Sequence, residues 1–322
     1  MAIKLDMSKA FDHVEWGFLE AVMEKLGFHE RWISLIIHCI TTITYSILIN
    51  GKAYGCISPT RGLRKGDPLS PYLFILCMEY LGHLIDEKCT SKDWNPVKAS
   101  RSGPALSHLF FADDLVFFAI ADVDNCHTIM SVLQAFCLKS GLRVSNTKSR
   151  VFFSLNVKPD QRDIMANLLG FSSTPNLGKY LGFPLKHPGT SRHDYNFVLD
   201  RVKKNLAGWK ANLLSMAGRL VLIQASTSAI LSYVMQNSIL PNKILNGIDR
   251  VNRNFLWGST DQVKKMHWVN WGEVTKPKEL GGLGLQSAKG RNTALLAKLN
   301  WRFQTEKDSL WAKVLRYKYC MH

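Results

Sequence analysis

The stretch LFFADDLVFF, residues 109–118, places two acids between two apolar runs. Each run has the length and composition of a buried strand. A carboxylate buried without a partner is strongly unfavourable, whereas a turn leaves it open to water or to a metal ion. The stretch therefore predicts a β-hairpin over residues 106–119 whose turn holds Asp113 and Asp114.

A third acid ends another short strand at the start of the chain. Residues 3–7 alternate in polarity, so the strand delivers Asp6 to its C-terminal edge. Ser8 is then expected to cap one helix that runs to about Gly27. If the three acids meet, their repulsion requires divalent cations, and carboxylate oxygens suit Mg²⁺. The alternative is that Asp113 and Asp114 are ordinary turn residues.

The order of the other predicted elements indicates an α+β fold, an antiparallel sheet with helices on one face. Before residue 160 we expect helices over 32–40, from Asp67-Pro68 to 81 and over 124–138, a strand over 45–49 turned by Asn50-Gly51, and strands over 142–153. From about Arg192 onward strand signals are few. Helices are expected there over 195–214, 218–236 and 243–257.

The chain carries 41 Lys and Arg against 25 Asp and Glu, a formal charge of +16, which favours nucleic acid as a partner. From residue 200 on, roughly 20 residues are basic and roughly 7 acidic. No amphipathic basic helix suggests a membrane surface. Seven scattered Cys, a charged N-terminal segment and the lack of an apolar run of about 20 residues favour an intracellular protein that is not secreted and has no membrane span.

Five motifs in order resemble those of reverse transcriptases, and in detail those of the plant LINE-type, non-LTR retrotransposon group. They are Asp6 with Ala10-Phe11-Asp12, RGLRKGDPLSP at 61–71, FADD at 111–114, LRVSNTKS at 142–149 and YLGFPL at 180–185. The resemblance implies a right-hand polymerase. Residues 1–185 would form the palm with partial fingers, and residues 186–322 a mostly helical, basic thumb or connection region.

The resemblance also implies a two-metal site for phosphoryl transfer. Asp6 and Asp113 match the principal ligands of two Mg²⁺ ions, for which Mn²⁺ could substitute, and Asp114 matches a weaker third ligand. Lys148 matches a basic residue near the departing pyrophosphate. A solvated surface lysine is the alternative for Lys148.

Further residues match substrate-binding positions. Phe11 resembles the aromatic gate that excludes a ribose 2′-OH, although a core residue on a helix face has the same pattern. The loop beneath the nucleotide and template would contain Arg64, Lys65 and Gly66. The primer-gripping turn would contain Tyr180, Leu181 and Gly182, for which a loop ended by Pro184 is the alternative.

The activity implied is RNA-directed DNA synthesis in the nucleus, with an RNA template, a DNA primer and deoxynucleoside triphosphates. Two departures stand against it. Lys65 replaces the Gln usual in this group, and Asp6 lies so near residue 1 that we expect an N-terminally truncated copy lacking the upstream fingers strands. The alternatives are an inactive remnant that only binds nucleic acid, and an intron maturase-like RNA binder.

Overall fold

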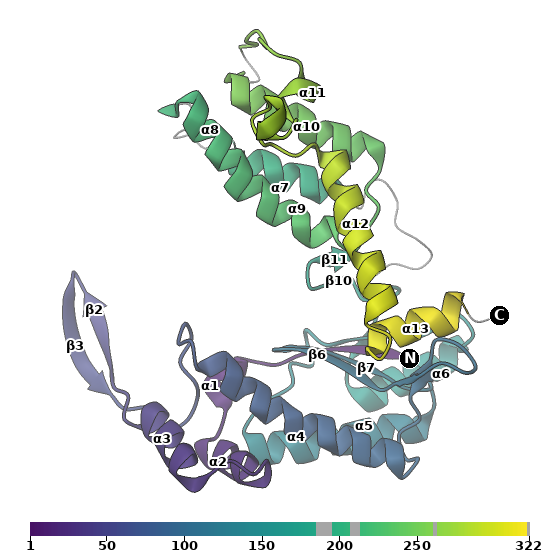
Figure 1. The fold of residues 1–322 in the computed structure, drawn as a ribbon. Coiled ribbons are helices and arrows are strands. Elements are labelled where there is room, and N and C mark those ends of the chain that lie inside the picture. The colour runs from purple at the N-terminus through teal and green to yellow at the C-terminus, as the bar shows by residue number, and fades with distance from the viewer. Residues whose placement is uncertain (185–194, 207–212, 260–262, 321–322) are drawn as a thin grey trace. The chain divides into compact units, whose positions relative to one another are not determined.

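The structure is a computed structural model that describes residues 1–184, 195–206, 213–259 and 263–320. The chain divides into two compact units (Figure 1). Residues 1–185 with 314–322 form the first unit, and residues 186–313 form the second. Strands and helices both occur, so the α+β class predicted from the sequence is confirmed.

A five-stranded sheet in the order β6-β7-β1-β8-β9 lies at the centre of the first unit. Its strands are β1 (Ala2–Asp6), β6 (His108–Phe111), β7 (Asp114–Phe118), β8 (Arg150–Phe152) and β9 (Ser172–Ser173). Neighbours are antiparallel except β8 and β9. The prediction of an antiparallel sheet is wrong at this edge because α6 (Pro159–Leu169) connects the two strands, and a helical crossover returns the chain in the same direction.

Alternation along β1 and β7 buries one face of this sheet. Ile3 and Leu5 pair with Phe117 and Leu115, and none of the four side chains is more than 1% exposed. They share one apolar cluster with residues of α4 (Ser70–Thr90) and α5 (Val123–Ser140), and Figure 1 shows both helices beside the sheet. Burial of this face directs the remaining side chains of β1 to the other face.

The helix expected to run from Ser8 to about Gly27 is two helices, α1 (Ala10–His13) and α2 (Trp16–Lys25). Between them Val14 and Glu15 are extended. The carbonyl of Val14 accepts a hydrogen bond from the Gly62 N–H at 2.8 Å, and the Glu15 N–H donates to the Ser140 carbonyl at 3.0 Å. The single-helix prediction is wrong because these distant partners take up the backbone groups that a continuous helix would pair internally.

Several local predictions of the first unit are confirmed. Helix α3 (Glu30–Thr41) and the hairpin of β2 (Tyr45–Ile49) and β3 (Lys52–Ile57) lie as expected. The turn residues Asn50 and Gly51 both have positive φ, at 50° and 79°, as this hairpin turn requires. Two short strands, β4 (Val97–Lys98) and β5 (Ala105–Leu106), precede β6.

Two boundaries differ from the prediction. Helix α4 begins at Ser70 instead of Asp67-Pro68, because the Asp67 side chain accepts the Leu69 N–H at 2.8 Å and a later proline occupies the first turn. Of the strands expected over 142–153, the structure has β8 and an isolated bridge between Val144 and Met7. The residues between them bond to Asp6 instead of forming a ladder.

The regular elements among the described residues of the second unit are all helices or helical turns, with no strand. Its elements are α7 (Asn196–Leu206), α8 (Met216–Leu222), the π-helical turn η3 (Ile223–Thr227), α9 (Ser228–Met235), α10 (Asn242–Trp257), α11 (Trp271–Val274), the 3₁₀ turn η4 (Lys278–Leu280) and α12 (Ala288–Thr305). Helix α13 (Leu310–Tyr319) begins in this unit and continues in the first. Within the described ranges, no helix has the length and apolar content needed to cross a bilayer.

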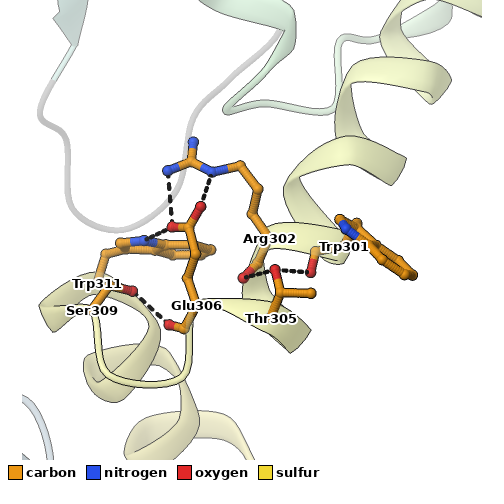
Figure 2. A network of polar contacts seen from close by, with 6 residues as sticks. All are labelled: Trp301, Arg302, Thr305, Glu306, Ser309 and Trp311. Carbon is orange, nitrogen blue, oxygen red and sulfur yellow. Dashed lines mark hydrogen bonds and ion pairs between the residues drawn. The ribbon is translucent and has the colours of Figure 1, made fainter.

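A polar network fixes the turn between α12 and α13 (Figure 2). The Glu306 carboxylate accepts from the Arg302 guanidinium at 2.7 and 3.0 Å and from the Trp311 indole N–H at 3.3 Å. The Ser309 hydroxyl donates to the Glu306 carbonyl at 2.8 Å. The hydrogen bonds from Arg302 hold the pKa of Glu306 below its usual value. Glu306 thus joins the last turn of one helix to the first turn of the next.

The close approach at Gly141 generates a stability prediction. Gly141 ends α5 with a φ of +76°, and a Cβ there would lie 2.6 Å from the His13 carbonyl oxygen and 2.7 Å from the Glu15 side chain. Strain at positive φ together with this overlap should lower the free energy of unfolding of Gly141→Ala by about 2–5 kcal/mol in urea.

The matched control is Gly27→Ala, because Gly27 has a similar φ of +82° but nothing within 4 Å of its Cβ position. The free energy of unfolding of this variant should fall only by the cost of strain at positive φ, about 1–2 kcal/mol. Equal losses in the two variants would contradict the tight packing of Gly141.

Candidate active site

Two carboxylates lie opposite each other at one end of the central strands. Asp6, the last residue of β1, pairs directly with Asp114, the first residue of β7. Cross-strand partners project from the same face, and alternation puts these two on the face opposite Leu5 and Leu115. Both are partly exposed. The register of the two strands therefore assembles an acidic pair outside the core.

The third acid, Asp113, lies with Ala112 in the turn between β6 and β7. Phe111 pairs with Asp114 across this turn, which leaves two residues in the connection, and Ala112 has a φ of +52°. Asp113 is exposed. The predicted hairpin is confirmed, with the difference that Asp114 belongs to the strand and only Asp113 to the turn.

Residues after α5 hold the backbone of Asp6. Its N–H donates to the hydroxyl of Ser149 at 3.2 Å, and its carbonyl accepts the N–H of Ser145 at 2.8 Å. Lys148, between them, has its Nζ 3.8 Å from a carboxylate oxygen of Asp6. The Lys148 side chain is 71% exposed, so this ion pair is weak and the amine remains accessible.

The loop around Gly62 is fastened to the segment that follows β1. The Leu63 N–H donates to the Phe11 carbonyl at 2.7 Å, and the Trp16 indole donates to the Gly62 carbonyl at 2.8 Å. Gly62 has a φ of +92°, and a Cβ there would lie 2.9 Å from the Asp12 carbonyl oxygen. Only glycine allows this approach.

Phe11, predicted as the sugar gate, lies in α1 and is half-buried. Its ring stacks on that of Phe74 in α4, with centroids 4.9 Å apart and an interplanar angle of 25°. The contact places Phe11 at the edge of the core cluster. The core alternative therefore has a direct contact in its favour, and the gate function stays a prediction.

The other nucleotide-loop residues are exposed. Lys65 forms an ion pair with Asp12 at 3.2 Å, and the Arg64 guanidinium lies 6.0 Å from the centre of the Tyr45 ring. Gly66 has a φ of +87° and open space at its Cβ position. Beside this loop is a cavity of about 240 Å³ whose lining includes Arg64 and Asp12 but neither Asp6 nor Asp113.

Oppositely charged side chains near the loop around Gly62 partly neutralise each other. Arg61 pairs with Glu15 at 3.1 Å, and both side chains are largely exposed. Burial lowers the pKa of His13 below its usual value, and the nearby guanidinium groups of Arg61 and Arg143 lower it further. The His13 imidazole is therefore neutral at pH 7, so it adds no charge to this region.

The predicted primer grip is a tight hairpin on a separate two-stranded sheet. Tyr180 ends β10 (Lys179–Tyr180) and pairs with Phe183 of β11 (Phe183–Pro184). Leu181 and Gly182 form the turn, with φ of 49° and 81°. Positive φ at both central residues is the pattern of the preferred two-residue hairpin turn. Leu185, the end of the quoted motif, lies outside the described residues.

The carboxylate chemistry at this end of the sheet fits Mg²⁺, which prefers hard oxygen ligands and keeps several waters. Asp6 and Asp114 are paired by register, and Asp113 is next to Asp114 in the chain. Over the described residues, however, no group of three His, Cys, Asp or Glu side chains forms a metal-binding cluster. The ligand function of the three acids stays a prediction.

Sequence reasoning missed the hydrogen bonds that Ser149 and Trp16 form. Ser149 was part of a quoted motif without an assigned function, and its bond to Asp6 spans 143 positions of the chain. The bond from Trp16 to Gly62 spans 46 positions. Neither partner is signalled by a local pattern, because both bonds form only after the sheet and helices have assembled.

The bond between Ser149 and Asp6 gives a second stability prediction. Ser149 is 0% exposed, so Ser149→Ala should leave the Asp6 N–H without its partner and lower the free energy of unfolding in urea by about 1–3 kcal/mol. Ser131→Ala is the control, because the hydroxyl of Ser131 is exposed on α5, and it should change stability by less than about 0.5 kcal/mol. A Ser149→Ala protein as stable as the control would refute the anchoring function.

Comparisons with known proteins identify the family of the chain. A family model described as reverse transcriptase (RNA-dependent DNA polymerase) matches residues 1–185. A protein of Arabidopsis thaliana named as a ribonuclease H protein is 43% identical over 136 residues, which are 42% of this chain and 22% of that protein. A retrovirus-related Pol polyprotein from a type-1 retrotransposable element of Popillia japonica is 24% identical over 312 residues, 92% of this chain and 48% of the polyprotein.

A solved structure of telomerase from Candida albicans, in complex with a fragment of telomeric RNA, aligns with a TM-score of 0.39 and 12% identity over 81% of this chain and 48% of that one. A score this low supports no conclusion about the fold. The chain spans less than half of the two sequence relatives described above. Because the family model covers residues 1–185 of 322, this protein belongs to the reverse transcriptase family of RNA-dependent DNA polymerases.

Proposed function

We propose that the first unit is the palm, with residual fingers, of an RNA-directed DNA polymerase, and that the second is its basic thumb or connection region. The observation that carries the proposal is the pairing of Asp6 with Asp114 beside the turn residue Asp113. In this proposal a primer 3′-OH attacks the α-phosphate of a deoxynucleoside triphosphate paired with an RNA template, and pyrophosphate leaves.

Asp6 and Asp113 would hold two Mg²⁺ ions, or Mn²⁺ in their place, with Asp114 as a weaker third ligand. Bound there, the ions would supply Lewis-acid stabilisation of the attacking and leaving oxygens. The side chains of Asp6 and Lys148 are 42% and 71% exposed, so both are open to a substrate in solution. Lys148 would turn from Asp6 to the departing pyrophosphate, whose negative charge its ammonium group would neutralise.

The nucleotide would lie against the loop held by Gly62. Arg64 and Lys65 are exposed cations on this loop, and Gly66 leaves open space for a close backbone approach. Lys65 is already paired with Asp12, so the cation that replaces the usual Gln is partly neutralised. Phe11 would present its ring edge to the sugar.

The turn of Tyr180, Leu181 and Gly182 would grip the primer strand, and the basic second unit would contact the phosphate backbone. We also propose that the chain derives from a plant LINE-type element and acts in the nucleus. The 43% identity to a protein of Arabidopsis thaliana and the relatives from retrotransposable elements support that origin.

A second candidate is a remnant that binds nucleic acid without catalysis. One observation favours it, since within the described part of the chain no three ligating side chains are gathered for a metal ion. Binding to template-primer without extension would distinguish this candidate from the polymerase. A preference for intron-containing RNA would indicate the maturase-like alternative.

The test is primer extension on an RNA template by the purified chain with Mg²⁺ and deoxynucleotides. If Asp113 is a metal ligand, Asp113→Asn should reduce extension to about 1% or less of the parent rate, since removing preorganised transition-state stabilisation costs about 10²–10³ in rate. Template-primer binding in a filter assay should be retained, because the fold does not depend on this exposed side chain.

Asp160→Asn is the matched control, an exposed acid in the first turn of α6, and it should extend primers at the parent rate. Extension that survives in Asp113→Asn would refute the proposed ligand. An inactive parent chain that still binds template-primer would favour the remnant.

The gate function of Phe11 predicts a change in sugar selectivity. Phe11→Val should raise the efficiency of ribonucleotide incorporation relative to deoxynucleotide by about tenfold or more, because a smaller side chain admits the 2′-OH. Phe18→Val is the control, since Phe18 is also half-buried and packs on Tyr80 and Phe136. Both variants should lose stability, but only Phe11→Val should lose selectivity; unchanged selectivity would leave Phe11 as a core residue.

A further inference from the structure

The second unit contains a cavity of about 310 Å³ that the proposed polymerase chemistry does not use. Ile223, Gln224 and Thr227 line it, and all three belong to the π-helical turn η3 between α8 and α9. π turns are rare, lie mostly within α-helices and are frequently found at functional sites. The cavity and the irregular turn thus mark the same place.

Two buried polar side chains form part of the cavity wall. Thr227 and Asn252 are each 4% exposed, and the Thr227 hydroxyl lies 3.3 Å from the Asn252 carbonyl oxygen, to which it donates. Among the residues that the structure describes, the amide nitrogen of Asn252 has no hydrogen-bond partner. Because Asn252 lines the cavity, this amide is a donor available to a polar ligand there.

Other polar groups face the same space. The Gln224 amide nitrogen reaches the Gly284 carbonyl at 3.4 Å, a long contact that a ligand could replace. Gln286 is exposed at the rim, and Arg291 also lines the cavity. The polar lining is therefore dominated by amide and hydroxyl groups, with one guanidinium as the positive charge.

The walls between these groups are apolar. Ile223, Leu231 and Leu285 line the cavity and are each at most 4% exposed. A ligand that matches this lining has a hydrogen-bonding edge with both donors and acceptors and has apolar faces. Amide side chains pair in this way with the edges of nucleobases, and unpaired bases are recognised by edge contacts and by packing of their faces. Free phosphate would use neither the acceptors nor the apolar walls.

The volume of the cavity and the positive charge of this part of the chain suit the binding of one nucleobase. A cavity of about 310 Å³ is at the small end of ligand pockets, which start at about 300 Å³. From residue 200 on the chain has roughly 20 basic against roughly 7 acidic residues, which attracts a nucleic-acid strand. We propose that this cavity binds a single unpaired nucleobase, with Asn252 and Gln286 contacting its edge and Arg291 the adjoining phosphate.

The experiment measures dissociation constants of the full chain for a short single-stranded RNA with 2-aminopurine at its centre and for the same RNA with an abasic nucleotide there. Both dissociation constants are measured at raised salt, because salt weakens the contacts to phosphate. The base-bearing strand should bind about tenfold more tightly, equivalent to the few hydrogen bonds and apolar contacts of one base. The same two strands made as DNA test whether the sugar is also recognised. A cavity that recognises only the base should give a similar ratio of dissociation constants for DNA and for RNA.

Asn252→Leu and Gln286→Leu should bring the ratio of the two dissociation constants close to one. Gln286 is exposed, so its variant tests the cavity even if loss of the buried Asn252 impairs folding. Asn300→Leu, at an exposed position of α12, should keep the parent ratio, and so should Asp113→Asn, which separates this site from the proposed polymerase centre. A parent ratio of one, or a ratio that neither cavity variant changes, would overturn the proposal.

Discussion

The pairing of β1 with β7 is the constraint on which the candidate site depends. Ile3 and Leu5 must face the core, and because side chains alternate along a strand, this burial directs Asp6 to the opposite face. The partner strand obeys the same rule, so Asp114 is placed beside Asp6 by the burial of Leu115 and Phe117. A register shift of one residue would bury an acid and expose a leucine. The position of the acids is thus a consequence of hydrophobic packing.

Backbone hydrogen bonds then fix the positions of segments that hydrophobic packing does not determine. Asp6 ends its strand, and its N–H and carbonyl are both bound by the segment that carries Lys148. On the other side, Gly62 approaches the segment after β1 so closely that a side chain could not be accommodated. The hydrogen bonds from Gly62 to the Val14 carbonyl and from Glu15 to the Ser140 carbonyl interrupt the helix between His13 and Trp16. The break in the helix at Val14 and Glu15 is therefore linked to the way the loop around Gly62 is held.

The sequence predicts those elements whose determinants are local. The hairpins at Asn50-Gly51 and at Asp113, and the helix that ends at Gly141, all follow from turn chemistry and short-range periodicity. Prediction fails where distant partners decide, as at the break after His13 and in the parallel strand β9. For the site, strand and turn patterns indicated the three acids and the motif resemblance added Lys148. The contacts of Ser149 and Trp16 could not be found, because their partners are 143 and 46 positions away.

In the second unit, the local sequence pattern predicts a helix but not the irregular turn within it. Apolar periodicity predicts one helix over residues 218–236, and the chain is helical there, but η3 widens one turn. Ile223 and Thr227, the first and last residues of η3, are both buried, one apolar and one polar. An apolar residue in place of Thr227 would avoid burying a hydroxyl, and a regular turn would keep the helix unbroken. An apolar side chain at position 227 would remove that hydroxyl from the cavity wall beside Asn252, so a ligand explains its burial better than packing alone.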